Sequence, residues 1–117
     1  MTSDEVARRK TVRLTTRGRK TGEPRTATIW FVADGPKRIV VQNATGASNW
    51  YRNLAKDPDV TLDFGTGPIT ARAEPIRDPA RIRQVLDMIR RKHWATAWLI
   101  QLLGRNATPV AAAISWD

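Results

Sequence analysis

The sequence of 117 residues contains no cysteine and a single histidine, His93. Without cysteine the chain can form neither a disulfide framework nor a thiolate metal site, and one histidine cannot build a histidine-rich metal centre. The sequence also shows no Ser-His-Asp set and no paired carboxylates of the kind used in general acid and base catalysis. These absences predict a protein without a metal and favour chemistry supplied by a bound cofactor.

Long apolar segments are also missing from this chain. The longest, residues 94–103, is interrupted by Thr96 and Gln101 and is too short to span a bilayer. Residues 1–13 are polar and basic, unlike the apolar core of a secretory signal. We therefore expect a cytoplasmic protein, and the length predicts one domain over residues 1–117.

Acidic residues are scarce, because 11 Asp and Glu stand against 20 Lys and Arg and give a formal net charge of +9. Such an excess attracts anions such as nucleic acid, anionic lipid or a phosphorylated cofactor. The cations cluster before residue 26 and again at residues 90–92. The sequence shows no helix-turn-helix, zinc site or aromatic-rich basic sheet motif, so we expect no nucleic-acid partner.

The most informative cluster is the turn at residues 15–25, between two segments with strand character. It contains two glycines (Gly18 and Gly22), three threonines (Thr15, Thr16 and Thr21) and four cations (Arg17, Arg19, Lys20 and Arg25). Guanidinium and ammonium groups bind phosphate and carboxylate oxygens, and glycines let successive backbone N–H groups point at an anion. The turn predicts an anionic ligand at the mouth of a β-structure, with a solvated basic hairpin as the alternative.

Hydrophobic periodicity and turn residues predict six strands and several helical segments. The strands are expected at residues 11–16, 26–33, 38–44, 60–64, 69–76 and 108–116. A short helix is expected at residues 3–9, and a second follows Ser48, its N-cap, and continues to Lys56. A third starts at Pro79 with Asp78 as its cap, and the helical pattern resumes over residues 94–103 with Gly104 as a C-terminal cap. This order favours a small, mostly antiparallel barrel over a parallel βαβ sheet.

Two motifs connect this pattern to a known family. The first reads Leu-Thr-Thr-x-Gly-Arg-Lys-Thr-Gly-x-Pro-Arg over residues 14–25, and the second joins Trp50-Tyr51-Arg52-Asn53-Leu54 to Asp57-Pro58-Asp59-Val60. With the Asp34-Gly35 turn between them, they resemble the deazaflavin-dependent nitroreductase family of actinobacteria. The resemblance implies an α+β, mainly β fold: a six-stranded split β-barrel like the FMN-binding proteins. A short helix follows strand three and a helical segment precedes the last strand.

The resemblance implies coenzyme F420 as the cofactor, with FMN or FAD as alternatives. The F420 tail carries a phosphodiester and an oligoglutamate chain, and it would be held by the cations of residues 17–25. Backbone amides at the loop after the third strand would meet the deazaflavin, and two residues of the short helix would face the same groove. The implied cofactor residues are Arg17, Gly18, Arg19, Lys20, Thr21, Gly22, Arg25, Asn43, Ala44, Thr45, Gly46, Trp50 and Asn53.

The activity implied is hydride transfer from reduced F420 to an electron-poor small molecule such as an activated alkene, quinone or nitro compound. Tyr51 and His93 are the proposed proton donors, with Ser48 and solvent as alternatives. Trp30, Trp94 and Trp98 are expected to line the substrate pocket, although each could instead pack against the barrel. Residues 92–100 contain no tyrosine, unlike the corresponding segment of family members that reduce nitro compounds.

A second hypothesis is a diverged, non-catalytic barrel that binds a fatty acid or lipid at an anionic membrane surface. It rests on the basic residues 90–92 beside the apolar run 94–103, an arrangement found in interfacial helices. The sequence leaves the oligomeric state open between a monomer and a homodimer.

Overall fold

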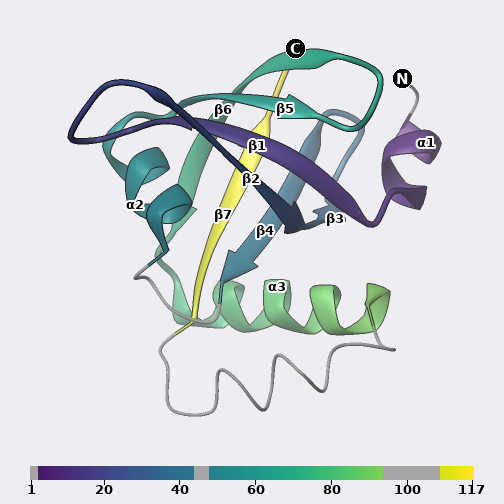
Figure 1. Cartoon of the computed structure of the whole chain (residues 1–117). Helices are drawn as coiled ribbons and strands as arrows, with labels where there is room; N and C mark the ends of the chain where they lie inside the picture. Colours follow the sequence, from purple (N-terminus) through teal and green to yellow (C-terminus); the bar gives the residue numbers. More distant parts are fainter. Residues whose placement is uncertain (1–2, 44–47, 94–108) are drawn as a thin grey trace.

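The computed structural model describes residues 3–43, 48–93 and 109–117 and builds them around one curled antiparallel sheet (Figure 1). The strands are β1 (Thr11–Arg17), β2 (Pro24–Trp30), β3 (Val32–Ala33), β4 (Arg38–Asn43), β5 (Asp59–Asp63), β6 (Pro68–Ile76) and β7 (Val110–Ser115). The helices are α1 (Ser3–Arg8), α2 (Asn49–Lys56) and α3 (Pro79–Lys92). The predicted mainly β, antiparallel architecture is confirmed, with the strand order β2-β1-β5-β6-β7-β4-β3.

The strand count differs from the six expected, because residues 26–33 do not form one strand. They divide at Phe31 into β2, which pairs with β1, and β3, which pairs with β4. Phe31 is fully buried, so its side chain turns into the core at the point where the chain leaves one neighbour for the other. Because β2 and β3 occupy opposite edges of the sheet and are joined by this one residue, the sheet must curl toward a barrel.

The interior of the curl follows from the two-residue period of the strands. In β1, Val12, Leu14 and Thr16 are buried while the residues between them face outward, and Val60 and Leu62 of β5 do the same. The inward set packs with Phe31, Ile39, Leu54 and Phe64 into the main core. Alternation in sequence therefore decides which face of each strand is inside.

Helix α3 covers the outer face of β4 and β7. Val85 and Ile89 pack there against Val40 of β4 and against Ala111 and Ala113 of β7 in a second apolar cluster. The start of α3 agrees with the prediction. The Asp78 carboxylate accepts a hydrogen bond of 3.1 Å from the Ala80 amide, and Pro79 is the first residue of the helix. The predicted helical continuation over residues 94–103 and its cap at Gly104 lie outside the described residues.

Helix α2 begins directly after Ser48, as predicted, although the Ser48 hydroxyl does not cap it. The helix lies beside the loop that joins β1 to β2 (Figure 1). Within the described ranges, no helix has both the length and the apolar character needed to cross a membrane.

Candidate functional site

A cleft of about 710 Å³ lies between the β1–β2 loop, the first half of β2 and helix α2. Its walls combine cations, hydroxyls, amides and one indole: Thr16, Gly18, Arg19, Lys20, Thr21, Pro24, Arg25, Thr26, Ala27, Asn49, Trp50 and Asn53. Three of these side chains are cationic, and none of the described lining residues is acidic. The described lining of the cleft therefore carries net positive charge, and it includes Gly18, Arg19, Lys20, Thr21, Arg25, Trp50 and Asn53 of the residues predicted for the cofactor.

Backbone hydrogen bonds fix the shape of the loop. The Gly18 amide donates to the Glu23 carbonyl at 2.8 Å, and the Gly22 amide donates to the Gly18 carbonyl at the same distance. Gly22 has φ 74°, a left-handed conformation that side chains other than glycine rarely adopt. The Thr21 hydroxyl accepts from the Glu23 amide at 3.3 Å. This arrangement explains why glycine and threonine stand at these positions.

Asn53 connects the loop to helix α2. Its Oδ1 accepts hydrogen bonds from the Arg19 amide at 3.2 Å and from the Arg19 guanidinium at 3.0 Å, and its Nδ2 donates to the Thr16 hydroxyl at 3.1 Å. Asn53 is only 2% exposed, and both ends of its amide are occupied. Its side chain therefore orients Arg19, besides lining the cleft.

Two further residues of α2, not predicted from the sequence, hold the same loop. Lys56 Nζ donates to the Arg19 carbonyl at 2.8 Å, and Asn49 Oδ1 lies 3.5 Å from the Arg19 guanidinium. Asn49, Asn53 and Lys56 follow the i, i+4, i+7 spacing of one helix face. That spacing is the signal that could have identified them in advance.

The other two cations of the cleft are less restrained than Arg19. Lys20 is exposed and has no ion-pair partner among the described residues. Arg25 lies 3.8 Å from the Glu23 carboxylate, with both side chains more than half exposed, a geometry that contributes little to stability. Lys20 and Arg25 are thus the cations most available to a ligand.

Several predicted site residues lie away from this cleft. Arg17 points elsewhere, 3.6 Å from the Asp57 carboxylate, and lines a separate hollow of about 290 Å³. Tyr51 is half-buried against the main core, with its ring roughly perpendicular to that of Trp50. Asn43 ends β4 opposite Val110. Predicted residues outside the described ranges are Ala44, Thr45, Gly46, Trp94 and Trp98.

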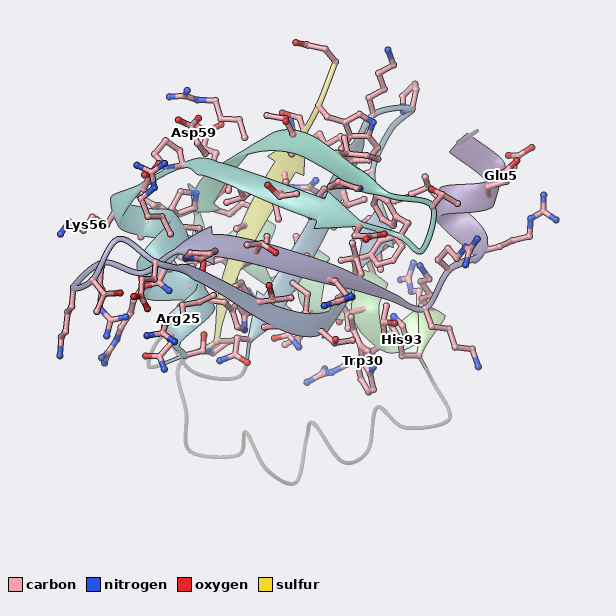
Figure 2. All side chains as sticks on the ribbon, turned by 45° about the horizontal axis from the view of Figure 1, so that its top comes forward. Glu5, Arg25, Trp30, Lys56, Asp59 and His93 are labelled. Atoms are coloured by element: carbon pink, nitrogen blue, oxygen red, sulfur yellow. The ribbon has the colours of Figure 1, made fainter. Side chains whose placement is uncertain are left out.

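His93 and Trp30 form a second group, at the far end of the sheet from Arg25 and Lys56 (Figure 2). Their rings stack at 4.6 Å between centroids, nearly parallel. His93 is buried, with Nε2 3.3 Å from the Phe31 carbonyl oxygen. Burial lowers the pKa of His93, although the hydrogen bond to Phe31 opposes this. In the described structure these two residues pack together and do not line the cleft.

Lys92, the last residue of α3, belongs to the basic residues 90–92, but its burial was not predicted from the sequence. Its ammonium lies 3.8 Å from the centroid of the Phe31 ring, an arrangement suited to a cation–π contact. Its Nζ is buried without a hydrogen-bond partner. Desolvation lowers the pKa of Lys92 to about 8.

We expect Lys92→Met to stabilise the fold by roughly 1–2 kcal/mol at neutral pH, because the cost of burying a charge without a hydrogen bond exceeds the gain from its contact with the Phe31 ring. The wild-type stability should rise as pH increases from about 8 toward 10.5, since the unfolded chain retains the Lys92 proton longer than the folded one. Denaturation midpoints measured across this pH range should show that the difference in stability between Lys92→Met and the wild type becomes smaller as pH rises. Parallel profiles would contradict the burial of an unpaired amine.

Comparison with known proteins gives a family match over most of the chain. The model of the F420H(2)-dependent quinone reductase family matches residues 3–98. Among curated proteins, the F420H(2)-dependent quinone reductase Rv1261c of Mycobacterium tuberculosis is 32% identical over 81 residues, covering 63% of this chain and 54% of the relative. The chain therefore spans about half the length of the curated relatives it matches.

Solved structures support the same fold. The conserved hypothetical protein Rv2991 from Mycobacterium tuberculosis superposes with a TM-score of 0.71 at 21% identity, over 98% of this chain and 81% of its own. The F420-H2 dependent reductase FDR-A gives 0.69 at 17% identity, over 92% of this chain and 95% of its own. At these identities the likeness concerns the fold alone. The family match over residues 3–98, on this fold, shows that the chain belongs to the F420H(2)-dependent quinone reductase family.

Proposed function

We propose that this protein binds coenzyme F420 in the cleft between the β1–β2 loop and α2 and uses its reduced form to reduce a quinone. The observation that carries the proposal is the composition of the cleft: three cations and an indole, with no acidic residue among its described lining. The family match supports the choice of coenzyme and of acceptor class. Activated alkenes and nitro compounds are further acceptors to test.

The residues present suit the coenzyme. Lys20 and Arg25 would pair with the phosphate and carboxylates of its tail, and the Asn53-held guanidinium of Arg19 would add a fixed positive charge. Trp50, half-buried at the cleft wall, offers an aromatic surface for a flat ring. When bound, the coenzyme supplies the hydride, and the chain supplies charge pairing, orientation and shelter from water.

The proton donor remains a prediction. Tyr51 and His93 are the residues proposed from the sequence, and neither contributes to the described lining of the cleft. Tyr51 is the nearer of the two by position, since it is adjacent to Trp50 and contacts its ring edge-on. Tyr51→Phe with unchanged coenzyme affinity and reduced turnover would support it.

A fluorescence titration with oxidised F420, run beside FMN, tests the cofactor. We expect saturable F420 binding that weakens with added salt, because the contacts are ionic. Addition of a quinone to the protein with reduced coenzyme should then restore the absorbance of the oxidised form. Binding of FMN alone would overturn the choice of coenzyme, and binding of neither would overturn the proposal.

No described observation favours the lipid-binding alternative, because the apolar run on which it rested falls outside the described residues. The oligomeric state also stays a prediction.

A further inference from the structure

A second groove lies on the face of the sheet on which α3 packs, over the neighbouring strands β4, β7 and β6 (Figure 1). It consists of two adjoining hollows of about 720 and 460 Å³, which share part of their lining. We call it the arginine groove, because four arginines line it: Arg38, Arg72, Arg77 and Arg81. None of its described lining residues lines the cleft beside α2, so it is a separate candidate site that the proposed function does not use.

The arginine groove carries positive charge. Its described lining includes two acidic residues, Glu74 and Asp78, and no lysine. The Asp78 carboxylate already accepts the hydrogen bond from the Ala80 amide at the start of α3. Four arginines against two carboxylates leave a net charge of +2, which attracts an acidic ligand.

The sheet register places two of these arginines on either side of one serine. Ser115 of β7 pairs with Arg72 of β6 on one side and with Arg38 of β4 on the other. Neighbouring strands are about 4.8 Å apart, so the two arginines begin roughly 10 Å apart across the sheet. A carboxylate above Ser115 can therefore accept hydrogen bonds from both guanidinium groups.

The internal ion pairs of these arginines are weak. Arg38 Nε lies 3.5 Å from the Asp34 carboxylate, and Arg72 lies 3.6 Å from the Asp59 carboxylate, with both members of the second pair about three-quarters exposed. Such pairs contribute little to stability. Arg77, at the other end of the groove, is exposed and forms no ion pair with a described residue. A ligand can engage these guanidinium groups without breaking a strong contact.

Glu74 sets the charge pattern between the two ends. It follows Arg72 by two residues on the same face of β6, is exposed, and forms no ion pair with a described residue. At about 3.3 Å per residue, Glu74 is roughly 7 Å and Arg77 roughly 17 Å from Arg72 along the chain. An extended segment of about six residues covers this length. Its best match carries acidic side chains at both ends and a basic side chain between them.

We propose that the arginine groove binds an extended acidic segment of a partner protein, with one basic side chain placed at Glu74. The groove follows a strand face and its charged walls are largely exposed, whereas small-molecule sites enclose most of their ligand. Arginine is also enriched at protein interfaces, and Arg clusters recognise acidic motifs. A second copy of this chain fits poorly, because two positively charged grooves would face each other.

The test uses fluorescence anisotropy with three labelled peptides. The first has two glutamates at each end and one lysine at its centre, the second has the same residues with the lysine moved to one end, and the third has glutamate in place of the lysine. Each is titrated with the wild type, with Arg72→Ala plus Arg77→Ala, and with Glu74→Lys. The control is Arg83→Ala plus Arg91→Ala, which removes the same charge from exposed positions outside the groove.

We expect the wild type to prefer the peptide with the central lysine. Arg72→Ala plus Arg77→Ala should weaken that peptide by roughly 5–30-fold, as expected for two exposed ion pairs, and the control should weaken it far less. Glu74→Lys should reverse the preference in favour of the all-glutamate peptide, a result that a loss of folding would not produce.

Three results would overturn the inference. The first is equal binding of the two peptides of identical composition, and the second is an equal loss in the two double variants. The third is tripolyphosphate binding as tightly as the best peptide, which would mark a site for small anions. None of these results depends on F420, so the proposed function would stand in each case.

Discussion

Replacing Lys20 and Arg25 together by alanine is expected to weaken F420 binding by about 2–4 kcal/mol, or roughly 30- to 1,000-fold. Both cations line the cleft, and neither is held in a strong ion pair within the described structure. Each charge-assisted bond to an anion contributes about 1.5–3 kcal/mol, and the two contributions are not fully additive. The measurement is a fluorescence titration at low and at physiological salt.

The matched control is Arg83→Ala with Arg91→Ala. Both residues are exposed on α3 and away from the cleft, so the pair removes the same net charge without touching the site. The control should reduce affinity only slightly, and the effect should vanish as salt screens long-range attraction. An equal loss in the two double variants would mean that the overall charge, and not the cleft, attracts the coenzyme.

Asn53→Leu is expected to lower the free energy of unfolding by about 2–4 kcal/mol although leucine has a similar volume. The change leaves the Thr16 hydroxyl and the Arg19 amide without the partner they have in the wild type, and it releases the Arg19 guanidinium. Chemical denaturation measures the loss. Coenzyme affinity should fall as well, because the loop is no longer held in its binding shape.

Asn49→Ala is the control for this experiment. Asn49 stands one turn earlier on α2, is exposed, and has only a long contact of 3.5 Å to Arg19. Its replacement should change stability by no more than about 0.5 kcal/mol. If Asn53→Leu were no more destabilising than Asn49→Ala, the buried amide would not be the link between loop and helix.

Local signals in the sequence predicted much of this structure. Alternation over residues 11–16 predicted β1, because a half-buried strand repeats every two residues. Asp78-Pro79 located the start of α3, since capping needs only neighbouring residues. The basic glycine turn was likewise recognised as a connecting loop, and the structure shows that its cations line a cleft; the anion site itself stays a prediction. Such features depend on short-range geometry that the sequence itself contains.

Only the tertiary structure decided what depends on residues far apart in the chain. Thr16 and Asn53 are 37 positions apart in the sequence, yet their side chains form a hydrogen bond. This contact helps to fix the Asn53 side chain, which lines the cleft and also orients Arg19. His93 meets the Phe31 carbonyl across 62 positions, at the opposite end of the sheet from Arg25 (Figure 2). The sequence by itself determined most of the strands, the starts of α2 and α3, and the charge of the loop. The curl of the sheet divides a predicted strand at Phe31, and it determines which side chains share a cleft. The sequence could not reveal this curl, because it depends on packing between distant elements rather than on local propensity.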